Sequence, residues 1–362
     1  MRARIPAWLA VAPTGFLLAW GGNHFTPLLH VYETVGGYAP WQANLLLGMY
    51  VAGLVPGMLL AAGLSDHHGR RPIAIAGLLA GALGSVVLGA SMSSFVLLCA
   101  GRVLAGIGVG VGMSVCSTWI KELSSAPYDP RATPTAGARR SSMILTLGFA
   151  LGAGVTGSLA QWAPLPGQLP FLVHLGLCLL AGIALLAAPE SLPRELRARG
   201  ALRDDLRVSS VRHPVFARIV LPAAPWVFAA AGVAYAILPA TVEAQMGDSA
   251  TIYATGLTVL TLGVGAIAQG TVGLIDRLTR GRALIVGLSG MSAGMILAAV
   301  AADLRRPVLV AGVAALLGAS YGVCVVAGLV IAQSLASPGE LAGITGVYYS
   351  LAYLGFLLQI GR

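Results

Sequence analysis

The sequence predicts an all-α polytopic membrane protein, and three observations lead to this fold class. Hydrophobic residues make up 57% of the 362 residues and charged residues only 10%. Soluble domains are about 25% charged, so a chain of this composition could not cover a surface that faces water. Apolar stretches of membrane length recur from one end of the sequence to the other, and positive charges gather between alternate stretches.

Each predicted helix is an apolar stretch long enough to cross a bilayer, which takes about 20 residues. The first stretch follows Arg2 and Arg4 and lacks a cleavage site of small residues, so we expect a retained helix and not a signal peptide. The eleven predicted spans are residues 7–30, 42–64, 72–92, 94–119, 141–162, 169–188, 216–241, 250–275, 283–302, 307–334 and 338–360.

Basic residues lie in alternate loops and predict the orientation of the chain. By the positive-inside rule, loops rich in Arg and Lys face the cytoplasm, which places the N-terminus there as well. The net charge of +9 is therefore a topology signal that suits a lipid bilayer and needs no nucleic-acid partner. Arg dominates and Lys121 is the only Lys, a composition typical of GC-rich bacterial genomes, so we expect a bacterial inner (plasma) membrane.

The long charged segment at residues 189–215 is the one internal boundary that the sequence predicts. It separates an N-terminal half of six helices (1–188) from a C-terminal half with five helices (216–362). Eleven helices that start in the cytoplasm would end on the opposite side, so we expect that a twelfth helix is missing from this chain. A true odd-numbered topology is the alternative.

The loop after the second predicted helix carries Asp66, Gly69, Arg70 and Arg71. Glycine permits a tight turn, and the arginines can then bind carboxylates and the exposed carbonyls of helix ends. We expect a charge cluster that holds the cytoplasmic side shut; the alternative is a basic loop that only fixes the topology. The loop after the eighth helix weakly repeats the pattern. The further residues of this predicted cytoplasmic gate are Glu122, Glu190, Asp276, Arg277 and Arg280.

Arg102 lies deeper in an apolar stretch than any other Lys or Arg, about eight residues into the fourth predicted helix, or roughly 12 Å at 1.5 Å per residue. A charge inside the membrane indicates a functional site with a partner on another helix. The first helix offers Asn23 and His24, and Glu33 lies at its outer end. We expect a substrate or proton-coupling site here, with His24 or Glu33 able to titrate. The alternative is a structural Arg102 that binds carbonyls and Asn23.

These motifs resemble those of the major facilitator superfamily, and the resemblance covers the full length of the chain. The family pattern of the loop after helix 2 is Gly-x-Leu-x-Asp-Arg-x-Gly-Arg-Arg/Lys, from which Ala62 and His67 depart. Sugar porters carry an Asp on helix 1 at about the level of Arg102, where this chain has Asn23 or His24. The matching residues are Leu64, Asp66, Gly69, Arg70 and Arg71 in the loop, Arg102, Gly106 and Gly108 in helix 4, Glu122 at its end, and Pro189-Glu190-Ser191 after helix 6.

The resemblance implies a secondary transporter in which two halves of six helices rock about a midplane site. It implies a small-molecule substrate, no metal and no cofactor except a proton as coupling ion, and we expect the protein to work as a monomer. A membrane-embedded enzyme is disfavoured because the helices contain no His-Glu-x-x-His, no Gly-x-Ser-x-Gly and no paired carboxylates.

The fifth predicted helix carries a glycine pattern similar to one found in exporters, Gly-x-x-x-Gly-Pro-x-x-Gly-Gly. Ala153 and Thr156 depart from it. Close packing of small residues against neighbouring helices is the alternative reading. The glycines of this pattern are Gly148, Gly152, Gly154 and Gly157.

The seventh predicted helix lacks the glutamines that sugar porters carry there, so the expected cavity is mostly apolar. We therefore expect proton-coupled efflux of drug-like or metabolite compounds. Uptake or facilitated transport of a small organic anion or metabolite, with Arg102 as the anion clamp, is one alternative. A non-transporting receptor or scaffold is another. Further candidates to line the cavity are Trp226, Tyr235, Gln269 and Tyr321.

Overall fold

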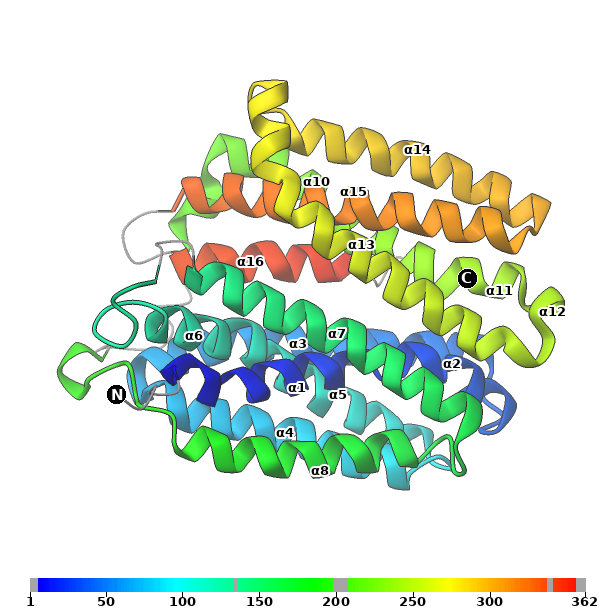
Figure 1. Cartoon of the computed structure of the whole chain (residues 1–362), viewed down its shortest axis with the longest axis horizontal. Helices are drawn as coiled ribbons and strands as arrows, with labels where there is room; N and C mark the ends of the chain where they lie inside the picture. The colour runs from blue at the N-terminus through cyan, green and yellow to red at the C-terminus, as the bar shows by residue number, and fades with distance from the viewer. Residues whose placement is uncertain (1–5, 133–135, 198–207, 337–340, 356–362) are drawn as a thin grey trace. The chain divides into compact units, whose positions relative to one another are not determined.

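The computed structural model describes residues 6–132, 136–197, 208–336 and 341–355, and every regular element within these ranges is a helix (Figure 1). The first helices are α1 (Ala12–Asn23), α2 (Phe25–Thr34), α3 (Pro40–His68), α4 (Arg70–Ala90), α5 (Phe95–Val111), α6 (Ser117–Leu123), α7 (Ala136–Trp162) and α8 (Leu169–Leu186). Those that follow are α10 (Leu221–Gly232), α11 (Leu238–Thr241), α12 (Glu243–Met246), α13 (Ala250–Thr279), α14 (Ala283–Leu304), α15 (Pro307–Ser334) and α16 (Leu341–Leu354).

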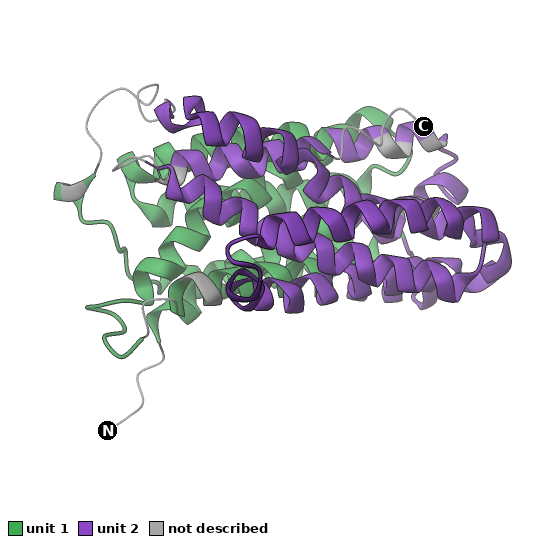
Figure 2. Cartoon of the chain, turned by 90° about the horizontal axis from the view of Figure 1, so that it is seen from above, with its two compact units in different colours: residues 1–24, 49–152, 167–207 green, residues 25–48, 153–166, 208–362 purple. Residues whose placement is uncertain are grey.

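The chain divides into two compact units, which Figure 2 colours separately. Unit 1 comprises residues 1–24, 49–152 and 167–207, and unit 2 comprises residues 25–48, 153–166 and 208–362. In unit 1, α1 packs against α4, α5 and α8. In unit 2, α15 packs against α10, α13, α14 and α16.

Nine helices within the described residues are long and apolar enough to cross a membrane. They correspond to nine of the eleven predicted spans, and α15 has the predicted bounds of residues 307–334. The all-α polytopic fold is therefore confirmed. The predicted last span, 338–360, contains α16, and residues 338–340 and 356–360 lie outside the described residues.

The first predicted span is divided at His24 into α1 and α2. The physical reason is Pro27, which has no backbone N–H to donate to Asn23 and whose ring crowds the carbonyl four residues before it. Each part is shorter than a membrane crossing requires, with 12 residues in α1 and 10 in α2. The break places the polar residues Asn23 and His24 at the C-terminal end of α1.

Small residues bring the helices of each unit close together. In unit 1, a Cβ added to Gly57 of α3 would lie 2.8 Å from the Cα of Ile107, and one added to Gly110 of α5 would lie 2.5 Å from the backbone N of Met58. In unit 2, a Cβ on Gly318 would lie 2.9 Å from the Cα of Thr261. Such close backbone contact is how helices associate where the hydrophobic effect between them is weak.

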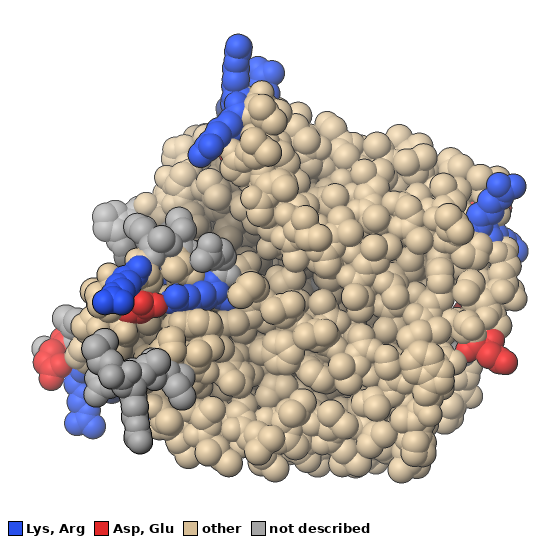
Figure 3. Space-filling view, in the orientation of Figure 1, with Lys and Arg blue, Asp and Glu red and all other residues tan. Residues whose placement is uncertain are grey.

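Charged side chains on the face shown in Figure 3 lie at helix ends, and the surface between them carries none. Large apolar side chains face outward instead, because a bilayer replaces water around them. On α8 the exposed apolar side chains are Leu172, Leu179, Leu180, Ile183 and Leu186.

Candidate functional site

The C-terminal end of α1 is buried in unit 1, and the predicted Asn23 there contacts a second helix. Its amide nitrogen donates a hydrogen bond of 2.9 Å to the carbonyl of Phe149 on α7. Gly22 permits this approach, because a Cβ there would lie 2.8 Å from Val109 Cγ2 and 2.9 Å from the Tyr50 hydroxyl. Glycine at this position thus lets α3, α5 and α7 converge on one point of α1.

Arg102 is buried on α5, with only 1% of its surface exposed. Its guanidinium carbon lies 4.6 Å from the ring centroid of Tyr50 on α3, within the range of a cation–π contact. Such a contact is worth about 2 kcal/mol or more when it is desolvated. Arg102 also interacts electrostatically with His24. The structure therefore brings together two of the predicted residues, His24 and Arg102, and Asn23 directly precedes His24 in the sequence.

His24 is 1% exposed and lies between two rings of α8. Its ring stacks on Phe171 with centroids 5.2 Å apart and meets the edge of His174 with centroids 4.6 Å apart. A Cβ on Gly21 would lie 3.1 Å from His174 Cε1, which is a tight contact, so the glycine gives this pair room. The contact between His174 and His24 was not predicted from the sequence.

His174 is fully buried and is held at both ring nitrogens. Nε2 lies 2.8 Å from the Leu17 carbonyl, which can only accept, so Nε2 carries the proton. In the neutral ring Nδ1 is then an acceptor for the Ser85 hydroxyl, 2.8 Å away. The Cys178 sulfur lies 3.6 Å from Nε2. These contacts fix the tautomer and orientation of His174.

The remaining predicted substrate residues lie in unit 2. Tyr321 is buried and contacts the ring of Phe228 at 5.5 Å, and Phe228 stacks on Tyr353 at 4.3 Å. Trp226 is 53% exposed and borders a shallow apolar groove with Pro222, so it stands apart from these buried rings. Tyr235 is buried, whereas Gln269 and Glu33 are half-buried.

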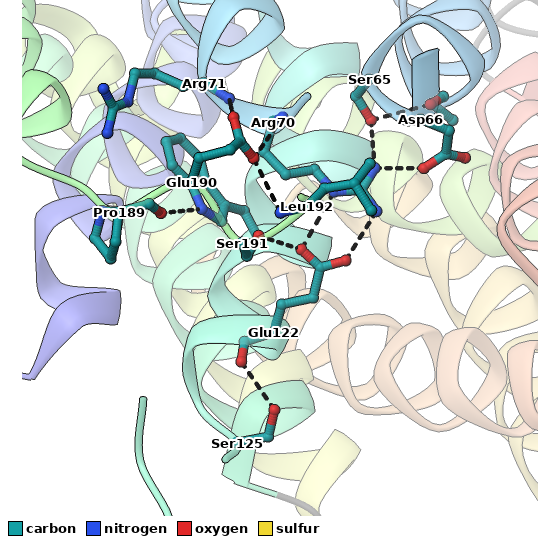
Figure 4. A network of polar contacts seen from close by, with 12 residues as sticks. Ser65, Asp66, Arg70, Arg71, Glu122, Ser125, Pro189, Glu190, Ser191 and Leu192 are labelled. Carbon is teal, nitrogen blue, oxygen red and sulfur yellow. Dashed lines mark hydrogen bonds and ion pairs between the residues drawn. The ribbon is translucent and has the colours of Figure 1, made fainter. Parts of the chain in front are cut away.

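The predicted gate residues of unit 1 form one network, which we name the α3–α4 loop network (Figure 4). Arg70 is its centre, with 7% of its surface exposed. Its guanidinium donates to Asp66 at 2.5 Å, to Ser65 at 2.7 Å and to Glu122 at 2.8 and 3.2 Å. The two contacts with Glu122 make a bidentate pair, which is the strong geometry for this ion pair. The members of the network are Ser65, Asp66, Arg70, Arg71, Glu122, Glu190 and Ser191.

Glu190 caps the N-terminus of α4 within the same network. Its carboxylate accepts hydrogen bonds of 3.0 Å from the backbone N–H groups of Arg70 and Arg71, and one of 3.2 Å from Leu192. A negative charge at a helix N-terminus is favourable because the first N–H groups have no partner in the helix. Gly69 precedes the helix at φ 99°, a conformation that only glycine adopts readily.

Arg71 and Ser191 tie the network to the end of α8. The Arg71 guanidinium donates to the carbonyl of Ala188. The Ser191 hydroxyl donates to Glu122 at 2.5 Å. Every contact of the network lies within unit 1, so it fastens α3, α4 and α6 to the segment that follows α8.

The predicted gate residues of unit 2 make fewer contacts. Asp276 accepts a hydrogen bond of 3.0 Å from the backbone N–H of Ala283 and so caps α14. Arg277 and Arg280 are exposed, and no hydrogen bond or ion pair of either side chain occurs among the described residues. Within the described part of the chain, the weak sequence repeat therefore does not correspond to a second network.

The predicted glycine motif on α7 faces two different helices. A Cβ on Gly152 would lie 2.8 Å from Trp20 Cα on α1, and one on Gly148 would lie 2.8 Å from the Ala19 Cβ. Both contacts lie in unit 1. In unit 2, a Cβ on Gly157 would lie 2.5 Å from Thr255 Cγ2 on α13, and one on Gly154 would lie 3.4 Å from Val259. Close packing accounts for Gly148, Gly152 and Gly157, whereas the contact at Gly154 is an ordinary van der Waals distance.

The chain belongs to the Major Facilitator Superfamily, whose sequence model matches residues 11–359. It is therefore a multi-pass membrane protein, and its family is one of transporters and not of enzymes. This confirms the family that the loop and helix-4 motifs predicted. Among the described residues, no group of three or more His, Cys, Asp or Glu side chains is placed to hold a metal ion.

Two curated relatives match about half of the chain. The probable glucose transporter rco-3 of Neurospora crassa is 35% identical over 173 residues, which are 45% of this chain and 27% of the relative. The arabinose-proton symporter of Bacillus subtilis is 27% identical over 180 residues, 47% of this chain and 36% of the relative. The chain thus spans about a third of the length of these relatives. Both are named as sugar transporters, so the predicted likeness to drug exporters finds no support here.

Solved structures share the fold. The human organic anion transporter MFSD10 matches with a TM-score of 0.63 and 19% identity, over 97% of this chain and 91% of that one. The nucleoside transporter NupG matches with a TM-score of 0.72 and 11% identity, over 98% of this chain and 90% of that one. At such identities the likeness establishes the architecture alone.

Proposed function

We propose that this protein is a proton-coupled transporter that takes up a small polar or anionic organic solute by alternating access. Its site lies in unit 1, where Arg102, Tyr50, His24 and Asn23 converge. The observation that carries the proposal is the burial of the Arg102 guanidinium inside a membrane-spanning helix. A charge at such a depth is expensive, and its retention is characteristic of substrate or ion pathways.

Uptake is preferred to the efflux that the sequence predicted. Efflux rested on the apolar seventh predicted helix and on the glycine motif of α7, and close packing against α1 and α13 accounts for Gly148, Gly152 and Gly157 of that motif without antiport. The arabinose-proton symporter among the relatives supports proton-coupled uptake as a working hypothesis. The bacterial inner membrane, the cytoplasmic N-terminus, the monomeric state and the two sequential halves of the chain remain predictions.

Export of apolar compounds remains a second candidate, because unit 2 contributes an aromatic cluster in place of polar side chains. Phe228, Tyr321 and Tyr353 pack ring against ring and are all buried. Such a surface suits an apolar or aromatic solute. A non-transporting receptor is the third reading, and any measured flux would exclude it.

The α3–α4 loop network is proposed to hold unit 1 rigid at its basic end while the protein changes state. Its contacts lie inside one unit, which supports the role of a fastening within that unit. Asp276, Arg277 and Arg280 are left out of this role because only Asp276 bonds to a described residue, as a helix cap.

Flux into proteoliposomes tests the proposed function. Purified protein is reconstituted with an imposed pH gradient, acid outside, and uptake of radiolabelled D-glucose, D-glucuronate and a hydrophobic cation is measured with a pH-sensitive dye inside. We expect uptake of a polar or anionic solute together with protons. Gradient-driven expulsion of the hydrophobic cation alone would establish export, and no flux of any compound by folded protein would favour the receptor.

A further inference from the structure

His24 is a buried side chain whose polar atoms call for an explanation. Both ring nitrogens are buried, and neither makes a hydrogen bond to any described residue. An unsatisfied buried polar group is destabilising, and native proteins rarely leave one without a bound partner or a function. The ring is also held in place by stacking on Phe171, so its nitrogens are presented in a fixed direction.

His174 differs from His24 in that both of its nitrogens are engaged. The Leu17 carbonyl accepts a hydrogen bond from Nε2, and the Ser85 hydroxyl donates one to Nδ1. His174 is therefore a fixed neutral ring, and its edge contacts the ring of His24. Of the two histidines, only His24 has a nitrogen lone pair that no described group occupies. His24 is therefore the member of the pair that can take up a proton or hydrogen-bond to a solute.

The charges and titratable groups around His24 come from three helices. Arg102 on α5 and His174 on α8 act on it electrostatically. Tyr50 on α3 lies over Arg102, and Cys178 on α8 contacts His174. A proton on His24 would place a second positive charge near Arg102, and the repulsion is strong where water is excluded. An anion bound beside both groups would offset that repulsion.

We infer that an organic monoanion binds beside Arg102 and that His24 takes up the transported proton, so that anion and proton bind cooperatively. The inference rests on the proposed function and names its substrate class and its coupling group. The anion favours the imidazolium, and by linkage the imidazolium favours the anion to the same degree. After the site opens to the other side, loss of the anion returns the proton from His24 to water.

Proton uptake on solute binding tests the inference. The purified protein in weakly buffered detergent solution is mixed with D-glucuronate, D-gluconate or lactate, and with the uncharged D-glucose and glycerol as matched compounds. A pH dye reports protons taken from solution. We expect about one proton per protein with a bound anion. We expect none with the uncharged compounds, none with His24→Gln, and wild-type uptake with the exposed control His213→Gln.

The role of His174 as a positioning residue has its own readout. Ser85→Ala removes the hydroxyl that donates to Nδ1 and leaves that lone pair open to a proton, while the Leu17 carbonyl still holds Nε2–H. A charge on His174 would act on the neighbouring His24, so the pH midpoint of proton uptake should shift. Anion binding at saturating concentration should persist. A purely structural role for Ser85 would lower the amount of folded protein and leave the midpoint where it was.

Three results overturn the inference while leaving the proposed function intact. They are anion binding by the wild type without proton uptake, undiminished proton uptake by folded His24→Gln, and exchange of D-glucose across proteoliposomes with no binding of any anion. If His24→Gln does not fold, the wild-type measurement with charged and uncharged compounds still decides whether a proton is taken up when an anion binds. No exchange and no binding of any compound would overturn the proposed function as well.

Discussion

The α3–α4 loop of unit 1 and the α13–α14 loop of unit 2 carry a similar set of residues but make different structures. Each has an Asp, a Gly at positive φ and several Arg: Asp66, Gly69 and Arg70 in one, Asp276 and Gly281 in the other. In unit 1 the arginine is buried among acids. In unit 2 the arginines are exposed and the aspartate only caps a helix.

The difference arises from residues outside the loops. Unit 1 supplies Glu122 from the end of α6 and Glu190 from the segment after α8, and both carboxylates bond to Arg70, one through its side chain and one through its backbone N–H. At the corresponding end of α15, Gln333 bonds to Thr345. A basic loop motif thus becomes a buried network only where distant elements bring carboxylates to it.

Among the variants that compare the two loops, Arg70→Ala should cause the largest loss of stability. It leaves Glu122 and Asp66 without their main partner, and breaking a buried ion pair costs about 3–5 kcal/mol. Because both acids are partly exposed, we expect a loss of about 2 kcal/mol in the free energy of unfolding. The measurement is heat-induced labelling of the buried thiols of Cys116 and Cys178 by a fluorogenic maleimide. An unchanged labelling temperature would contradict the network.

Gly69→Ala and Gly281→Ala compare the space that the two turns leave for a side chain. Gly69 has φ 99°, and a Cβ there would lie 2.8 Å from Glu190 Oε2, so we expect a loss of about 2 kcal/mol. Gly281 has φ 82°, and a Cβ added there would have no atom within 4 Å, so the cost is conformational, about 1 kcal/mol. The same thiol-labelling assay ranks them; equal losses would show that the carboxylate does not constrain Gly69.

Glu190→Gln should cost about 1 kcal/mol, because the amide keeps one acceptor at the N-terminus of α4 and loses the charge. Asp276→Asn is the matched change in unit 2, where one backbone N–H is involved in place of three. We expect a smaller loss there. Added salt provides a second test. Because salt screens charges, it should reduce the loss of stability caused by Glu190→Gln.

Arg277→Ala should have the smallest effect, within about 0.5 kcal/mol, because an exposed side chain with no described partner contributes little. Arg280→Ala is the companion variant, although its backbone is left-handed, with φ 57°. A loss as large as that of Arg70→Ala would mean that unit 2 contains a network of its own.

The sequence predicted the helices well, because each span is long and continuously apolar and needs no tertiary information. It also identified Asn23, His24 and Arg102 as candidates, since polar residues stand out in such stretches, and their role in transport stays a prediction. The division of the first span at His24 was missed, although Pro27 was a signal for it.

The partners of these residues were not predicted. His174, Tyr50 and Ser85 meet them across helices, and such contacts depend on how each helix is rotated about its axis. Helices that are apolar all round give no periodic pattern from which to read that rotation. Trp226 shows the same limit, because an aromatic residue suits both a lipid-facing surface and a core.

The central claim is that the buried polar site of unit 1 carries transport, and solute counterflow across proteoliposomes tests it most directly. The experiment compares wild type, Arg102→Ala and the exposed control Arg306→Ala, preloaded with unlabelled D-glucuronate or D-glucose and without any pH gradient. We predict that Arg102→Ala abolishes exchange of the solute that the wild type moves, while Arg306→Ala exchanges it normally. Wild-type exchange by Arg102→Ala would contradict the account.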